Sequence, residues 1–325
     1  MIRIAIGRCS IVVLLMLAAL ARPASATTFE AWLQDFRREA AAAGITEATL
    51  ERAFRDIAPI ERVIESDRRQ VETRMDFETY RRRVLSEDRV SQGRRLLEKH
   101  RDLLEGIGRD FGVQPRFIVA LWGIESTFGA YKGTYPVVPA LATLAWEGRR
   151  ASFFRGELLS ALRILDAGDI AVEDMKGSWA GAMGQSQFMP SSFVRFAVDY
   201  DGDGRRNIWS STPDVLASIA NYLAKAGWTD RYTWGREVLP PAALGADLVG
   251  LEVRKPLPAW QELGVRRKNG AALPAVPIDA SLVWMDDRAG PAFLVYKNFR
   301  VLMAWNRSTY FAATVGELAD RLARA

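Results

Sequence analysis

The sequence predicts an α+β protein that is mainly α-helical, with an all-α region first and a small β-rich lobe near its end. Apolar residues recur at helical spacing along much of the 325-residue chain. Residues 236–299 differ, because half of the fourteen prolines lie there among short runs that are typical of strands. A single hydrophobic core stops growing at about 250–300 residues, so we expect more than one lobe.

Two small counts restrict the chemistry that this chain can perform. It has one cysteine, Cys9, and one histidine, His100. A Ser-His-Asp triad or a thiol nucleophile would depend on these single residues, and His and Cys cannot supply a zinc ligand set. We expect His100 at the surface, next to charged residues. Catalysis would therefore rely on carboxylates, hydroxyls, amides or a bound cofactor.

Residues 1–26 are predicted to be a secretory signal peptide. Two arginines precede the apolar run at 10–20, and residues 24–26 (Ala-Ser-Ala) match the A-x-A cleavage pattern. The run is too short to span a bilayer, although a short membrane anchor remains the alternative. Cleavage would remove Cys9 and three of the 44 basic residues, leaving 41 against 39 acidic residues. The charge balance therefore gives no reason to expect nucleic-acid binding.

The mature chain begins with a predicted helix. Phe29, Trp32 and Phe36 recur at helical spacing, Thr27 and Glu30 fit a capping box, and a glycine ends the pattern. Helix-like stretches with long charged faces continue to about residue 112. The sequence therefore predicts an α-helical flanking region over residues 27–112.

The rest of the chain divides by composition. Residues 113–235 are rich in glycine, aromatic and hydroxyl residues and form the expected core. The β-rich lobe is expected over residues 236–305, with strand-like runs at 282–284 and 293–296. The last segment, 306–325, holds a helix from about Ser308 to Leu322 that returns to the core.

A carboxylate lies on an apolar face of one predicted helix. The helix starts with Pro115 in its first turn, and Leu121, Trp122 and Glu125 share a face. A carboxyl held against Trp and Leu loses hydration, which raises its pKa and suits a general acid at neutral pH. The alternative is a glutamate that reaches solvent or pairs with an arginine.

The segment from Lys176 to Ser192 is rich in small residues. We expect its glycines to let the backbone approach a ligand closely, and Ser178, Gln185 and Gln187 to offer neutral hydrogen-bonding groups. With Trp179 and Phe188 as apolar faces, this mixture suits a sugar. The alternative is a tight glycine-rich contact between two helices.

Residues 199–207 reproduce the first half of an EF-hand loop. Asp199, Asp201 and Asp203 stand at positions one, three and five, a glycine follows, and Arg205 could lend its carbonyl. Ser210 replaces the acidic residue of position twelve. A metal-free Asp/Gly turn is therefore the alternative to a cation site.

Taken together, these segments resemble the lytic murein transglycosylase B family, periplasmic glycoside hydrolases that cleave peptidoglycan strands. The resemblance covers nearly the whole mature chain and implies a lysozyme-like catalytic core over residues 113–235. It rests on several long motifs in the right order: LWGIESTFG (121–129), PALATLAWEGRR (139–150), GSWAGAMGQSQFMPSSF (177–193), VDYDGDGRRNIW (198–209), IANYLAKAGW (219–228) and YKNFRVLMAWNRSTYFA (296–312).

The resemblance implies a set of functional residues, with Glu125 as the single catalytic acid/base. The residues that it places around the scissile sugars are Ser178, Gln187, Phe188, Tyr222 and Asn306, with Tyr80 and Arg150 as further wall residues. The residues that it implies for a structural Ca²⁺ or Na⁺ site are Asp199, Asp201, Asp203, Arg205 and Asp214. The chain departs from the family at Trp305, where a Tyr usually precedes the Asn, and at Ser210 and Ser211. No cell-wall-binding module is expected after Ala325.

The implied reaction needs one carboxylate and no cofactor. Ordinary glycosidases use two carboxylates, and the Glu125 motif offers no obvious second one. In a lytic transglycosylase, the N-acetyl group of the substrate stabilises the oxocarbenium-like state and the muramic acid C6 hydroxyl attacks the anomeric carbon. The MurNAc-GlcNAc β-1,4 bond is thereby exchanged for a 1,6-anhydromuramoyl end.

Two other functions stay open at this point. A hydrolytic muramidase would need a base for water, which the acidic stretch from Asp199 to Asp214 could supply if it folds near Glu125. A non-catalytic cell-wall-binding protein would not depend on Glu125. The expected partner is the peptidoglycan glycan strand, and peripheral membrane association and contacts with other cell-wall enzymes stay open.

Overall fold

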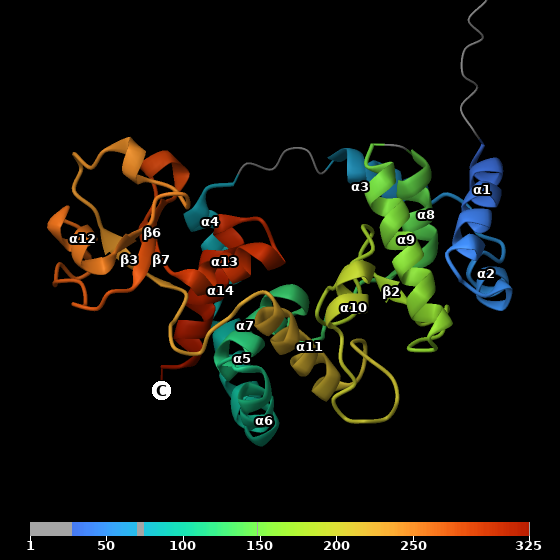
Figure 1. Ribbon diagram of the computed structural model, residues 1–325, viewed down its shortest axis with the longest axis horizontal. Coiled ribbons are helices and arrows are strands. Elements are labelled where there is room, and N and C mark those ends of the chain that lie inside the picture. Colours follow the sequence, from blue (N-terminus) through green and yellow to red (C-terminus); the bar gives the residue numbers. More distant parts are fainter. Residues whose placement is uncertain (1–27, 70–74, 148, 325) are drawn as a thin grey trace, which may run out of the picture.

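The computed structural model describes residues 28–69, 75–147 and 149–324, so the expected signal peptide lies outside the described residues. Figure 1 shows an elongated molecule with a helical body at one end, a second helical body in the middle and the β-rich lobe at the other end. Fourteen α-helices and seven short strands make up the described part, which confirms the mainly helical α+β class. None of the helices in these ranges is long and apolar enough to cross a membrane.

The helical body at the N-terminal end consists of helices that are not consecutive in the chain. They are α1 (Phe29–Ala42), α2 (Glu47–Ala53), α3 (Glu61–Arg69), α8 (Val137–Glu147), α9 (Ala151–Asp166) and α10 (Pro190–Phe196). The apolar helix α8 lies between α9, α3 and α1, as expected for a helix without a polar face. The predicted capping box is wrong, because the N-cap of α1 is Thr28, which accepts the Ala31 N–H at 3.3 Å. Thr27 lies outside the described residues.

The middle body surrounds one buried helix. Its elements are α4 (Phe77–Val84), α5 (Glu87–Lys99), α6 (Arg101–Phe111), α7 (Pro115–Ser126), α11 (Thr212–Lys225), α13 (Lys297–Trp305) and α14 (Thr309–Leu322). Every side chain of α7 from Phe117 to Trp122 is buried, and α5, α6, α11 and α14 pack against this helix. Because α7 needs cover on all sides, the segment expected as one flanking region is divided: α1–α3 lie in the first body and α4–α6 in the middle one.

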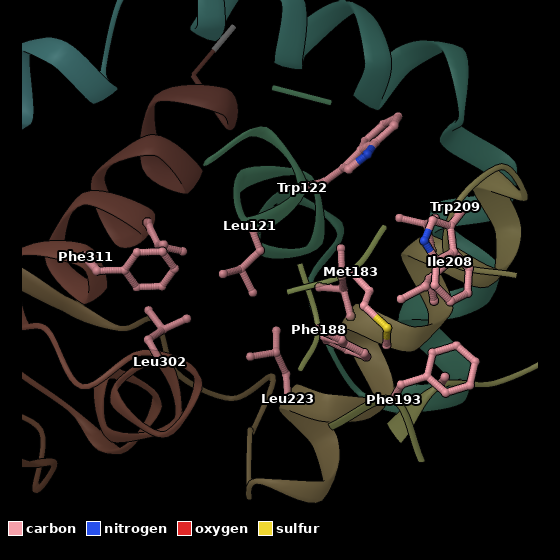
Figure 2. Close-up of a cluster of buried hydrophobic side chains, with 14 of the residues drawn as sticks. Leu121, Trp122, Met183, Phe188, Phe193, Ile208, Trp209, Leu223, Leu302 and Phe311 are labelled. Carbon is pink, nitrogen blue, oxygen red and sulfur yellow. The ribbon is translucent and has the colours of Figure 1, made fainter. Parts of the chain in front are cut away.

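The core of the middle body joins distant parts of the chain. Figure 2 shows Leu121 of α7 in one cluster with Leu223 of α11, Leu302 of α13 and Phe311 of α14. Each of these four side chains is less than 5% exposed. The C-terminal helix thus returns to the core, as the sequence predicts, and begins one residue later than expected, after the Ser308 cap.

The β-rich lobe contains an antiparallel sheet in the order β4-β6-β7-β3-β5. The strands are β3 (Gly235–Leu239), β4 (Lys255–Pro256), β5 (Arg266–Arg267), β6 (Asp279–Trp284) and β7 (Ala292–Val295), with α12 (Leu257–Glu262) and the 3₁₀ turns η1 (Ala246–Leu248) and η2 (Asp286–Arg288). Alternate residues face opposite sides, so Leu282 and Leu294 belong to the lobe's own core while Val283 and Phe293 join the main core. A separate strand pair, β1 (Tyr135–Pro136) with β2 (Lys176–Gly177), lies beside α8.

Candidate active site

Glu125 lies in the last turn of α7 and is half-buried. Burial raises the pKa of its carboxyl from 4.5 to about 7. A carboxylate in the last turn also faces the negative end of the helix dipole, which disfavours ionisation in the same direction. The helix ends at Ser126, one residue after Glu125, because Thr127 adopts a left-handed backbone (φ 51°). The residue therefore has the raised pKa that the sequence predicts.

The aromatic partner of this carboxyl is Trp305, at the end of α13. Its indole N–H donates a hydrogen bond to Glu125 Oε1, with an N···O distance of 2.7 Å. This bond favours the carboxylate and opposes the effect of burial on the pKa. The sequence singled out Trp305 only as a departure from the family, and the 180 residues between the two positions carry no signal of their contact.

The expected partner on the same helix, Trp122, has another role. Its indole N–H donates to Gln185 Oε1 at 2.9 Å, and Gln185 Nε2 donates to the Trp209 carbonyl. Gln185 is buried, so the expectation that it offers hydrogen bonds to a ligand is wrong. His100 was expected at the surface but is half-buried, with its ring edge-on to Trp122, and burial lowers its pKa.

Trp305 belongs to an aromatic cluster with Tyr222 and Phe188, two of the expected wall residues. Its ring centroid lies 4.6 Å from Tyr222 and 5.3 Å from Phe188. The Tyr222 hydroxyl donates to the Ala304 carbonyl at 2.8 Å and so ties α11 to the end of α13. Phe188 is only 2% exposed, so it supports this cluster and does not offer its own face to a ligand.

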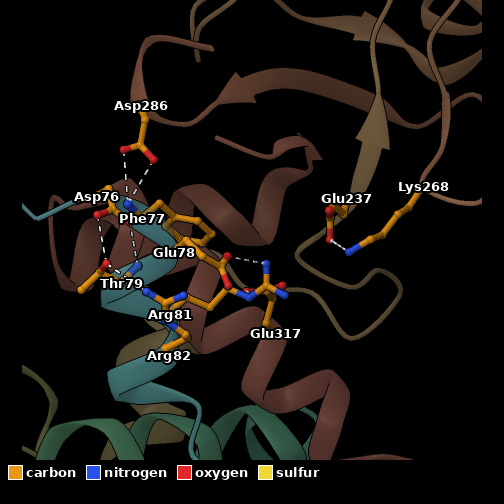
Figure 3. A network of polar contacts seen from close by, with 10 residues as sticks. All are labelled: Asp76, Phe77, Glu78, Thr79, Arg81, Arg82, Glu237, Lys268, Asp286 and Glu317. Carbon is orange, nitrogen blue, oxygen red and sulfur yellow. Dashed lines mark hydrogen bonds and ion pairs between the residues drawn. The ribbon is translucent and has the colours of Figure 1, made fainter. Parts of the chain in front are cut away.

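Tyr80 of α4 lies close enough to Glu125 for the charge of the carboxylate to act on its phenol. Burial and the charge of Glu125 both raise the pKa of this phenol. Figure 3 shows how the helix that carries Tyr80 is held: Asp286 accepts the Phe77 N–H, and Arg81 pairs with Glu78 and with Glu317 of α14. These contacts fix α4 against the β-rich lobe and α14.

The polar wall residues occupy two segments. Ser178 Oγ accepts the Ala182 N–H at 3.0 Å, and Gln187 Nε2 donates to the Gly184 carbonyl at 2.7 Å. Gln187 has φ 50°, a left-handed conformation that is uncommon outside glycine and is often found at functional sites. Asn306 directly follows Trp305 in extended backbone and is exposed. The loop that carries Ser178 and Gln187 also carries Phe188, and thereby reaches the Trp305 cluster.

The glycines of this loop serve the fold and not the approach of a ligand. A Cβ atom on Gly184 would lie 2.6 Å from the Ile208 carbonyl oxygen, and one on Gly177 would lie 2.3 Å from the Ala182 carbonyl oxygen. Both distances are too short for any side chain. The loop is therefore packed against the protein's own backbone, as a close contact between loop segments and not the contact between two helices that was the alternative.

Arg150 forms an ion pair within the first helical body. Its guanidinium pairs with Asp67 Oδ1 of α3 at 2.7 Å and lies over the Phe154 ring of α9. Arg149 pairs with the same carboxylate, and together the two arginines lower the pKa of Asp67. These contacts place Arg150 in the first helical body, with Asp67 and not Glu125 as its acidic partner.

The EF-hand-like loop brings three carboxylates together. Asp199, Asp201 and Asp203 each have an oxygen within 4.8 Å of the others, a separation that one cation could bridge. Asp214 is not part of this group: it is fully buried and accepts backbone N–H groups of the loop. Ser211 donates to Asp201 Oδ2 at 2.6 Å, and the Arg205 N–H donates to Asp203.

Comparisons with known proteins agree on one family. The family described as "Transglycosylase SLT domain" matches residues 28–320. The membrane-bound lytic murein transglycosylase B of Escherichia coli K12 is 33% identical over 253 residues, 76% of this chain and 67% of the relative. SltB3 from Pseudomonas aeruginosa, solved with NAG-NAM-pentapeptide, superimposes with a TM-score of 0.89 at 44% identity, covering 92% of this chain and 80% of that one. The Escherichia coli lytic transglycosylase Slt35, solved with calcium, has a TM-score of 0.77 at 28% identity, covering 90% and 92%.

Proposed function

The chain belongs to the transglycosylase SLT domain family and is a lytic transglycosylase of peptidoglycan, and we propose that Glu125 performs both proton transfers of its reaction. The observation that carries this proposal is a single carboxyl whose pKa burial raises to about 7 and whose Oε1 is held by the Trp305 N–H. At neutral pH such a group is present in both protonation states, as an acid that later acts as a base must be.

The first step breaks the MurNAc-GlcNAc bond. Protonated Glu125 gives its proton to the glycosidic oxygen, the C1–O bond breaks, and the GlcNAc side leaves as an alcohol. The N-acetyl carbonyl oxygen of MurNAc stabilises the positive charge that develops at C1. This internal group takes the place of the nucleophilic carboxylate of ordinary retaining glycosidases.

The second step closes the sugar on itself. Glu125, now a carboxylate, removes the proton of the MurNAc C6 hydroxyl, and the C6 oxygen attacks C1. The product is a 1,6-anhydromuramoyl end, no water is consumed, and Glu125 is again protonated for the next cycle. In this scheme Ser178 and Asn306 hold the acetamido group, while Gln187 and Tyr222 contact the neighbouring sugars.

The structure favours this reaction over hydrolysis by a muramidase. Ordinary hydrolytic glycosidases use a second carboxylate near the first, as the base for water or as the nucleophile. Two effects shift the pKa of Glu125: its burial and the hydrogen bond from the Trp305 indole. No other carboxylate of the described residues contributes to this shift. The carboxylates from Asp199 to Asp214 bind N–H and hydroxyl groups of their own loop.

The products of digested peptidoglycan test the proposal. Mass spectrometry of purified sacculi treated with the protein should find muropeptides with anhydro ends, each lighter by one water than its reducing counterpart. Mainly reducing-end products would assign the protein to the muramidases. Unchanged sacculi, equal to those treated with Glu125→Gln, would favour a protein that only binds the cell wall.

We propose further that the loop at Asp199, Asp201 and Asp203 binds Ca²⁺ as a structural ion. Three carboxylates in close reach repel one another, and a hard cation with oxygen ligands relieves that repulsion. The calcium complex of Slt35 supports the choice of ion.

The signal-like residues 1–26 support export to the periplasm, where peptidoglycan lies. Secretion of a reporter protein fused to these residues tests this location.

A further inference from the structure

We infer that Trp305 is a positioning residue that directs the catalytic proton of Glu125 to Oε2. This inference rests on the proposed role of Glu125 as the acid/base. It starts from the 2.7 Å hydrogen bond in which the Trp305 indole is the donor and Glu125 Oε1 the acceptor.

The chemistry of the indole decides which oxygen carries the proton. An indole N–H has one hydrogen and no acceptor, so it can only donate. The carbonyl oxygen of a protonated carboxyl is a far better acceptor than its hydroxyl oxygen. A donor fixed at Oε1 therefore makes Oε1 the carbonyl oxygen and leaves Oε2 to carry the proton and to meet the glycosidic oxygen.

The donor is held in place by its surroundings. The Trp305 ring packs against Tyr222 and Phe188, at centroid distances of 4.6 and 5.3 Å. The Tyr222 hydroxyl also holds the Ala304 carbonyl, one residue before the tryptophan. A hydrogen bond that is fixed before the substrate arrives needs no reorganisation during the reaction.

Two other titratable groups lie around the pair, Tyr80 on α4 and Tyr222 on α11. Burial raises the pKa of both phenols above their ordinary value of 10. They stay neutral between about pH 4 and pH 9, because an ordinary phenol titrates only near 10; the charged groups that act on them are Arg89 for Tyr80 and Arg195 for Tyr222. A pH dependence that changes with Trp305 therefore reports on Glu125.

The test compares Trp305→Phe with Trp305→Tyr. Phenylalanine keeps an aromatic ring against Tyr222 and removes the donor, so the alkaline limb of the kcat/KM profile should move up by about one pH unit or more. We expect kcat to fall by roughly tenfold to a hundredfold, with a smaller change in KM, because the proton is no longer fixed on the oxygen that faces the glycosidic bond. Tyrosine restores a donor, so its alkaline limb should return toward that of the wild type.

A second measurement does not depend on activity. In an infrared difference spectrum at low pH, wild type minus Glu125→Gln, the carboxyl C=O stretch of Glu125 should lie at a low frequency because Oε1 accepts a hydrogen bond. In a Trp305→Phe background the band should move to a higher frequency. An unchanged band, or an alkaline limb that stays in place in a folded Trp305→Phe variant, would overturn the inference. An active Glu125→Gln protein would instead overturn the proposed role of Glu125.

Discussion

Asp214 accepts the backbone N–H of Asn207 at 2.7 Å from a fully buried position in the first turn of α11. Its other oxygen accepts the Tyr200 N–H at 2.8 Å. One carboxylate thus ties both arms of the acidic loop to α11, although the resemblance to the family implied this residue as a cation ligand. The loop therefore has an inner acid that holds the chain and three outer acids that could hold an ion.

Asp214→Asn should destabilise the protein whether or not calcium is present. The amide keeps the size of the side chain but has one acceptor oxygen for the N–H groups of Tyr200, Asp201 and Asn207, so at least one donor loses its partner. We expect a loss of about 1–3 kcal/mol in the free energy of unfolding, measured by urea denaturation. Asp203→Asn, at an exposed position of the same loop, is the control and should cost much less without calcium. Equal stabilities of the two variants would contradict this role of Asp214.

Calcium should raise the melting temperature of the wild-type protein. An ion that binds only the folded state contributes about 2.7 kcal/mol at a hundred times its Kd, which differential scanning calorimetry with and without EGTA would detect. Asp201→Asn should remove this gain and leave the calcium-free protein at least as stable, because one of three repelling charges is gone. If calcium and EGTA give the same transition, the loop is a turn and not a cation site.

Glu125→Gln should abolish most of the activity without unfolding the protein. Gln keeps the shape and can accept the Trp305 hydrogen bond, but it can neither give nor take a proton. We expect turnover of sacculi to fall by at least about 10²–10⁴-fold, with an unchanged circular dichroism spectrum. A folded variant that retains activity would show that another residue is the acid/base.

The same substitution should change the pH dependence of stability. The folded pKa of Glu125 is about 7 against 4.5 when unfolded, so the wild type loses stability as the pH rises between these values. Gln does not titrate, and the variant should gain up to about 3 kcal/mol over the wild type by pH 7, with no gain near pH 4. Parallel denaturation curves at pH 4 and pH 7 measure this difference. A constant difference would mean that the carboxyl keeps its ordinary pKa.

The wild-type activity should decrease at alkaline pH. The first step needs protonated Glu125, so kcat/KM should fall tenfold per pH unit above about 7. A soluble glycan fragment assayed from pH 5 to about pH 9 gives this profile. If the alkaline limb of the kcat/KM profile were centred below about pH 5.5, the proton donor would be a solvated group, which would contradict the effect of burial on Glu125.

Local pattern was enough to predict most elements of the fold. The helix from Pro115, the strands near residues 282 and 293, and the last helix after Ser308 occur where the sequence indicates them. Helical and strand periodicity depend on neighbours along the chain, so the sequence carries them directly. The errors concern a position one residue apart, at the cap of α1, and features that depend on distant segments. The latter include the exposure of His100 and Gln185 and the expected flanking region 27–112, whose helices divide between two bodies.

Helix spacing along the chain was enough to place Glu125 on the apolar face of α7 and to predict that its pKa is raised, because residues three and four apart share a helix face. The burial that raises the pKa is completed by the helices packed around α7. Which indole contacts that carboxylate depends on the packing of segments that are far apart in the chain. Trp122 stands one turn away on the same helix, yet its N–H is used by Gln185, and Trp305 reaches Glu125 from 180 residues further along. Helices α7 and α13 meet because both pack around a shared core. A contact between segments that are 180 residues apart produces no periodic pattern in the sequence, so it could not be predicted from the chain.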